Sequence, residues 1–223
     1  MIIHLSLHGI IGLCTILLIW ITGIRAFIQY KKTKIPSLLL FSFTFFTGGF
    51  TYLTAIIPSF LRAPELFSPL FAIGTIPLAF GIAAYLAMIS KFIPMLAPWK
   101  NIIFIGLVAL GLLTAFTVYK LPMELTFTEE GWTSFQYPPL VRVLFLTFLS
   151  ISMLAGGTTF FVRGIKVTDE AIRERAVLNG IGFFLLAVGI FLAVFGEAIL
   201  YNFLFLMGYL LIFARVSSED RTI

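Results

Sequence analysis

Long apolar stretches separated by short polar segments constrain this chain more than any other feature. A helix that crosses a bilayer needs roughly 20 mainly apolar residues. Seven segments meet this requirement: 3–27, 36–60, 66–90, 101–119, 139–162, 176–195 and 198–214. The sequence therefore predicts an all-α membrane protein, a single domain of residues 1–223 built as a bundle of seven transmembrane helices.

Composition excludes other classes of protein. Of the 223 residues, 60% are hydrophobic and 11% are charged, whereas soluble domains have about 45–50% and about 25%. This excludes a soluble enzyme, a disordered chain and a nucleic-acid-binding protein, and it makes the lipid bilayer the main partner. Phenylalanine is common, with 26 residues that lie mostly within the spans. We interpret these rings as lipid-facing bulk and helix packing rather than as a ligand pocket.

We divide the last apolar stretch, residues 176–214, into two spans. Residues 176–214 hold a single charge, Glu197, and one helix of that length would overshoot the hydrocarbon about twofold. Gly196 followed by Glu197 supplies a helix stop and an acidic helix start. We therefore expect two helices here, with the break at these two residues.

The basic residues indicate the orientation of the spans. Twelve of the 15 lie in or beside segments on one side of the predicted bundle: Arg25, Lys31, Lys32, Lys34, Lys91, Lys100, Arg163, Lys166, Arg173, Arg175, Arg215 and Arg221. The positive-inside rule places this side in the cytoplasm. The N-terminus is then outside, the C-terminus is cytoplasmic, and the plasma membrane is the expected location of this multi-pass protein.

The longest outer segment, residues 120–138, is predicted to form a short β-hairpin between the fourth and fifth spans. Residues 125–128 and 133–137 alternate in polarity on either side of a turn that contains Gly131, which is typical of a hairpin. A two-stranded hairpin is marginal in water, so we expect it to lie on the mouth of the bundle. It either covers an outer cavity or simply tethers two helices.

Polar side chains form candidate linings for a site inside the bundle. They are Thr44, Thr47, Thr51 and Thr54 of the second span, Thr147 and Ser150 of the fifth, and Asn202 of the seventh. The four threonines recur at intervals of three, four and three, so they share one helix face. Such hydroxyls either join helices by hydrogen bonds or line a cavity for a small neutral or lipid-like ligand.

Two other groups of residues lie near the outer face. Arg142 lies about one turn inside the fifth span and Glu197 begins the seventh, so we expect them to form a partly desolvated outer ion pair. In the alternative interpretation each charge reaches separately towards the interface. His4 and His8 are spaced i, i+4 and are weak candidates for metal ligands, because a metal site needs further ligands. The sequence indicates no particular cofactor.

Ionisable residues are absent from the middle of every predicted span. Such groups mark proton relays and ion paths, so their absence argues against a proton pump or a proton-coupled carrier. The sequence contains no Ser-His-Asp, Cys-His or paired buried carboxylate arrangement. Enzyme activity is therefore not expected, and an intramembrane enzyme without recognisable motifs is the minor alternative.

The sixth predicted span begins in the cytoplasm. Thr168 is followed by Asp169 and Glu170, a pattern typical of a helix N-terminus. We expect Thr168 to be the N-cap and the helix to run from about residue 169 into the span.

The same span carries a resemblance to a known class of proteins. Residues 173–176, Arg-Glu-Arg-Ala, lead into an apolar helix with Gly180, Gly182 and Gly189. About 20 residues here resemble the sixth helix of prokaryotic seven-helix membrane sensor regions, which precede histidine kinases or cyclic-dinucleotide enzymes. The resemblance implies that the bundle receives a signal. Since only residues 215–223 follow the last span, without an output domain, such signalling would use a separate membrane or cytoplasmic partner.

Taken together, these patterns predict a non-catalytic, receptor-like or accessory bundle. It would bind a small hydrophobic or neutral ligand, or another membrane protein, between the first, second, fifth and seventh helices. The alternative is a facilitative small-molecule carrier with a three-plus-one-plus-three helix repeat. The glycine pairs at 48–49 and 156–157, at comparable depth in the second and fifth spans, indicate this repeat.

Overall fold

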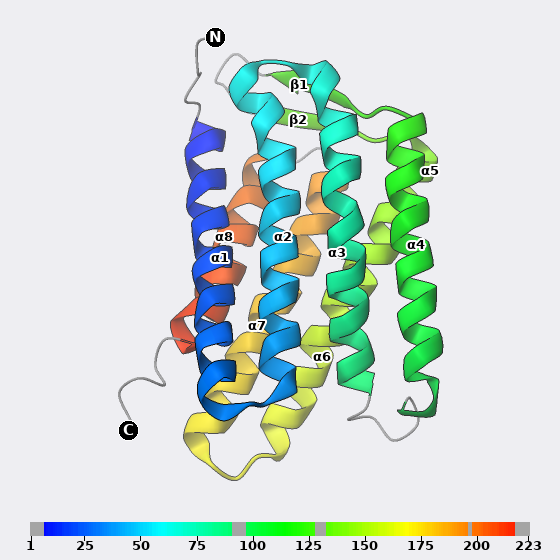
Figure 1. Ribbon diagram of the computed structural model, residues 1–223. Helices are drawn as coiled ribbons and strands as arrows, with labels where there is room; N and C mark the ends of the chain where they lie inside the picture. Colours follow the sequence, from blue (N-terminus) through cyan, green and yellow to red (C-terminus); the bar gives the residue numbers. More distant parts are fainter. Residues whose placement is uncertain (1–6, 91–96, 128–132, 196–197, 217–223) are drawn as a thin grey trace.

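The computed structural model describes residues 7–90, 97–127, 133–195 and 198–216. The helices are α1 (Leu7–Thr33), α2 (Pro36–Leu61), α3 (Phe67–Ser90), α4 (Lys100–Lys120), α5 (Pro139–Phe145), α6 (Ile151–Lys166), α7 (Glu170–Val194) and α8 (Ala198–Val216). A π-helical turn, Leu146–Ser150, joins α5 and α6 into one continuous rod. The described chain is therefore an all-helical bundle of seven rods with one small hairpin (Figure 1).

Six of the rods are long and apolar enough to cross a membrane: Gly9–Thr33, Pro36–Leu61, Pro64–Ala87, Ala97–Lys120, Pro139–Lys166 and Ile172–Val194. The protein is a multi-pass membrane protein by the length and hydropathy of these helices, and its apolar helices contact the lipid bilayer. The seventh rod, α8, has a shorter apolar part, Leu200–Phe213. Its 19 residues extend over roughly 28 Å, so the seventh crossing stays a prediction.

The helix ends confirm one predicted boundary and correct another. The break in the last apolar stretch is confirmed, because α7 ends at Val194 and α8 begins at Ala198. The predicted N-cap of α7 is wrong. Asp169, not Thr168, is the N-cap, and its carboxylate accepts a hydrogen bond at 3.0 Å from the backbone N–H three residues later.

The first helix extends further than predicted. It continues past residue 27 to Thr33, and its last turn holds Lys31 and Lys32. Cations in this position interact favourably with the partial negative charge of a helix C-terminus. The helix ends where Lys34 adopts a positive φ of 58°.

The rods form a closed ring. In Figure 1, α1 to α4 lie in front, and α6, α7 and α8 lie behind them. Each rod contacts the next one along the chain, and α8 also contacts α1. The ring order is therefore α1, α2, α3, α4, the α5–α6 rod, α7, α8 and back to α1.

The predicted hairpin is confirmed. Strands β1 (Glu124–Phe127) and β2 (Thr133–Gln136) pair antiparallel, with Leu125 opposite Phe135. Both of these side chains are buried. The hairpin lies across one end of the bundle, which we call the hairpin end (Figure 1). As expected, it rests on the mouth of the bundle.

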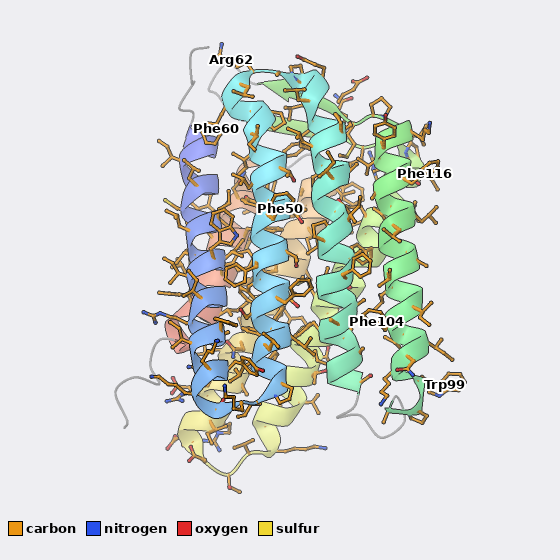
Figure 2. All side chains as sticks on the ribbon, in the orientation of Figure 1. Phe50, Phe60, Arg62, Trp99, Phe104 and Phe116 are labelled. Carbon is orange, nitrogen blue, oxygen red and sulfur yellow. The ribbon has the colours of Figure 1, made fainter. Side chains whose placement is uncertain are left out.

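The opposite end of the bundle carries exposed lysines, and we call it the basic end. It holds Lys31 and Lys32 at the end of α1, Lys100 at the start of α4 and Lys166 at the end of α6. The outer faces between the two ends carry large apolar side chains, including those of Phe50 on α2 and Phe116 on α4 (Figure 2). These faces suit contact with lipid tails.

Candidate functional site

A cavity of about 110 Å³ lies inside the bundle in the half nearest the hairpin. Among the described residues, those that line it come from every rod except α1 and α4, and two more lie at the hairpin. Half of the lining residues are aromatic: Tyr52, Phe67, Phe71, Phe135, Tyr137, Phe145, Tyr201, Phe205 and Tyr209. We call this space the aromatic cavity.

Aromatic rings at the hairpin form one wall of the aromatic cavity. The Phe135 ring stacks on Phe67, with 4.9 Å between centroids, and lies 6.0 Å from Tyr201. The Tyr137 ring lies 5.8 Å from Phe145. Aromatic pairs at such distances contribute about 0.5–1.5 kcal/mol beyond their burial. The hairpin therefore packs on α3, α5 and α8, and two residues at the hairpin, Phe135 and Tyr137, line the cavity.

The wall between α2 and α8 is fixed by a hydrogen bond. The Tyr52 hydroxyl donates to Asn202 Oδ1 at 3.0 Å, and the Tyr52 ring stacks on Phe205 at 5.8 Å. The Asn202 side chain is fully buried and is not part of the cavity lining among the described residues. The side chain of Asn202, a predicted lining residue, thus holds Tyr52 in place, and Tyr52 lines the cavity.

The polar atoms at the aromatic cavity are neutral. No charged residue lines it in the described part of the chain. The hydroxyls of Tyr137 and Tyr209 belong to its described lining and are neutral hydrogen-bond donors. Burial raises the pKa of the Tyr137 phenol above its ordinary value of 10.0, so this hydroxyl remains a neutral donor at physiological pH. The cavity can therefore receive an apolar molecule with a hydrogen-bond acceptor.

The threonine stripe of α2 mainly joins α2 to α3. Thr44 donates to the Gly81 carbonyl at 2.9 Å, and Thr51 donates to the Gly74 carbonyl at 2.7 Å. A methyl group added at either glycine would overlap the hydroxyl of another threonine of the stripe. Within the described lining, Thr51 is the stripe residue that also borders the aromatic cavity. The stripe as a set of ligand contacts stays a prediction.

Thr147 and Ser150 lie in the π-helical turn between α5 and α6. Leu149 of the same turn lines the aromatic cavity, whereas these two candidates do not appear in its described lining. The Ser150 hydroxyl is buried, without a hydrogen-bond partner in the described structure. The π turn was not predicted; such turns are frequent at functional sites.

The outer ion pair stays a prediction, because Glu197 lies outside the described residues. Its proposed partner Arg142 is described. The Arg142 guanidinium lies 5.4 Å from the centre of the Phe195 ring and donates to the Tyr137 carbonyl at 3.5 Å.

The metal hypothesis is likewise untested. His4 lies outside the described residues, and the side chain of His8 is not described. In the described part of the chain, no group of three potential ligands could hold a metal ion.

The sequence patterns predicted a polar rather than an aromatic lining, although the spacing of the aromatic residues carries a signal for it. Tyr201, Phe205 and Tyr209 recur every four residues in α8, and Phe67 and Phe71 are also four apart in α3. Such spacing places rings on one helix face. Aromatic periodicity, rather than hydroxyl periodicity, marked the faces that surround the cavity.

Comparison of the sequence with protein-family models finds no match, and comparison with curated proteins finds none either. The resemblance to sensor regions therefore stays untested.

Proposed function

We propose that this protein is a receptor-like or accessory membrane protein that binds a small, neutral, largely apolar ligand in the aromatic cavity. The observation that supports this is the aromatic cavity, whose described lining holds no charged residue and includes Phe135 and Tyr137 at the hairpin. An apolar cavity of about 150 Å³ holds benzene. The somewhat smaller space of about 110 Å³ suits a short aliphatic or small cyclic group.

The lining chemistry favours a ligand with one acceptor atom. The phenols of Tyr137 and Tyr209 can donate to a carbonyl or ether oxygen, while the rings around them contact the apolar part. An ionised ligand would lose its hydration without meeting an opposite charge, which is strongly unfavourable. The preferred class is therefore a small neutral ketone, ester or ether rather than an acid or an amine.

We further propose that the hairpin end faces the outside of the plasma membrane. The lysines at the basic end support this through the positive-inside rule. A ligand would then reach the cavity from the outer face. The resemblance of α7 to the sixth helix of sensor regions favours a signalling role, which would act through a separate membrane or cytoplasmic partner.

The carrier hypothesis remains the second candidate. The aromatic cavity lies between α2 and α3 on one side and α6, α7 and α8 on the other, and carriers with internal repeats bind between their halves. Two measurements distinguish the roles. A carrier should superpose its first three rods on its last three, and it should move cyclopentanone across a vesicle membrane at a rate that saturates.

Filling the aromatic cavity tests the binding proposal. A Cβ added at Gly48 meets only a Leu78 methyl, at 4.0 Å, so Gly48→Leu should fold and extend into the cavity. We expect purified wild-type protein to bind cyclopentanone in calorimetric titrations more tightly than cyclopentane, and not to bind butanoate. Gly48→Leu should weaken cyclopentanone binding by about tenfold or more, equivalent to about 1.4 kcal/mol.

Gly106→Leu is the matched control. A Cβ at Gly106 on α4 meets no atom within 4 Å, and Gly106 is not part of the described lining of the aromatic cavity. This variant should bind cyclopentanone as the wild type does. Equal weakening by both substitutions, or equal affinity for cyclopentanone and butanoate, would contradict the proposal.

A further inference from the structure

A second cavity, of about 690 Å³, lies between α4 and α6 in the half of the bundle nearest the basic end. Ile103 and Leu107 form part of its α4 wall, Leu154 and Thr158 part of its α6 wall, and Leu86 of α3 part of its floor. We call it the lateral cleft. Its described lining is uncharged and mostly apolar, as expected for a surface in contact with lipid tails.

The path of the fifth rod creates the lateral cleft. Near the hairpin end, α4 contacts α5 and the π turn, whereas α6 packs on α7 and α3. Figure 1 shows α5 beside the upper part of α4 and α6 passing behind α3. The two rods therefore diverge below the π turn. Gly106 keeps the α4 wall open, since no atom lies within 4 Å of a Cβ added there.

The depth of the lateral cleft corresponds to one leaflet. Trp99, at the start of α4, is 55% exposed and lies at the basic end of the molecule (Figure 2). Exposed tryptophans mark the headgroup level. The α4 wall reaches to Leu110, which lies roughly 16 Å from Trp99 along the helix. This is about half of the 30 Å hydrocarbon thickness, so the cleft accommodates an acyl chain from the leaflet at the basic end.

Positive charge lies at the ends of both cleft walls. Lys100 is the first residue of α4 and Lys166 the last residue of α6, and both are exposed. Neither forms a salt bridge within the described residues. The N-terminus of α4 adds partial positive charge beside Lys100. Phosphate groups of anionic lipids are attracted to such positions.

We propose that the lateral cleft binds an anionic phospholipid of the leaflet at the basic end. One acyl chain lies between α4 and α6, and the phosphate lies at Lys100 and Lys166. A zwitterionic lipid with the same chains fills the cleft equally well but gains less from the lysines. This site is separate from the aromatic cavity and does not depend on the function proposed for it.

Native mass spectrometry of the delipidated full chain tests the headgroup part of the proposal. Phosphatidylglycerol and phosphatidylcholine with identical chains are added in equal amounts. Since one lysine near an anionic surface contributes about a fivefold preference, wild-type protein should retain phosphatidylglycerol at least about fivefold more than phosphatidylcholine. The double variant Lys100→Gln, Lys166→Gln should retain the two lipids almost equally.

Lys120→Gln, at the other end of α4, is the matched control and should keep the wild-type preference. Lys120 is exposed, as are the two cleft lysines. If the double variant keeps the preference, or if Lys120→Gln removes it to the same extent, the headgroup site is wrong.

Gly106→Leu tests the position of the acyl chain. It should reduce retention of both lipids about fivefold or more, while Gly48→Leu should leave retention unchanged. Its melting temperature should equal that of the wild type, because the added side chain meets open space. Unchanged lipid retention would overturn the proposal. So would a dimer in the wild type that Gly106→Leu converts to a monomer, since the cleft would then be an interface between two copies of the chain.

Discussion

Single side chains determine how closely α2 and α3 approach each other. Gly74 and Gly81 lack the Cβ that would overlap the threonine hydroxyls, and their carbonyls accept hydrogen bonds from Thr51 and Thr44. In lipid, where apolar burial gives little drive for association, such close packing and hydrogen bonding between helices are major stabilising terms. The stripe is therefore a structural contact between two helices as well as a border of the aromatic cavity.

Thr51→Val tests the strength of one of these contacts. The substitution removes the hydroxyl that bonds across to α3, and we expect the free energy of unfolding to fall by about 0.6 kcal/mol, up to about 1.7. Thr75→Val is the control, because the buried Thr75 hydroxyl bonds at 2.8 Å within its own helix, to the Phe71 carbonyl. Unfolding in mixed micelles with increasing dodecyl sulfate measures both, and an equal loss in the two variants would contradict the interhelical role.

Sequence patterns predict which face of a helix is buried better than they predict which single residue caps it. The period of the stripe correctly placed Thr47, Thr51 and Thr54 inside the bundle, where all three are buried. The cap of α7 was assigned to Thr168 rather than Asp169. Both side chains are good N-caps, and the choice between them depends on where the chain turns into the helix, which neighbouring residues alone do not specify.

The hairpin and the π turn differ in how far the sequence predicts them. The hairpin has a sequence signature, since alternating polarity around a glycine suits a two-stranded ribbon and little else. The π turn at Leu146–Ser150 has none, because Leu-Thr-Phe-Leu-Ser is equally compatible with an ordinary helix. Its presence depends on packing against α4 and α7, which the turn contacts.

The hairpin is expected to loosen in alkaline solution through Tyr137. Burial raises the pKa of its phenol above 10.0 in the folded protein. The stabilisation from the neutral phenol is therefore complete below pH 10 and is lost progressively as the pH rises above that value. Melting temperatures of the wild type should consequently fall more steeply above pH 10 than those of Tyr137→Phe.

Comparing the melting temperatures of the wild type and Tyr137→Phe at each pH removes the pH-dependent contributions that the two proteins share, including those of the other tyrosines. Limited proteolysis within the hairpin should increase over the same pH range in the wild type. Parallel melting curves between pH 8 and pH 11 would show that ionisation of Tyr137 does not control hairpin closure.

The whole molecule has a predicted orientation that labelling can test. Its single cysteine, Cys14, is on an exposed surface of α1 and can be replaced by alanine to give a cysteine-free background. Glu124→Cys in β1 and Thr168→Cys before α7 then place thiols at exposed positions near opposite ends. A membrane-impermeant maleimide should label the first in intact cells and the second only after permeabilisation.

A reporter fused after Ile223 completes that experiment. It should face the cytoplasm if α8 makes the seventh crossing and the start of α1 is outside. Labelling of both engineered cysteines in intact cells, or an external reporter, would show that the number of crossings or the orientation is wrong.

Sequence predicted the number of rods and their approximate ends, because bilayer thickness imposes length and apolarity on every span. It also predicted the hairpin, because alternating polarity around a glycine is typical of one. It did not predict the aromatic cavity or the lateral cleft. Both depend on which helix faces meet and on the divergence of α4 and α6 below the π turn. An apolar face that packs on a neighbour and one that meets lipid have the same composition, so Phe71 and Phe116 look alike in sequence although only the first is buried.

The contact between α1 and α8 has a consequence for the order of biosynthesis. Every other junction of the ring joins rods that are adjacent in the chain, so these junctions can form as each helix leaves the insertion machinery. The last junction waits for the final helix, which also supplies Tyr201, Phe205 and Tyr209 to the cavity wall. Until translation reaches α8, the nascent protein is an open arc of helices with its central aromatic surface facing lipid.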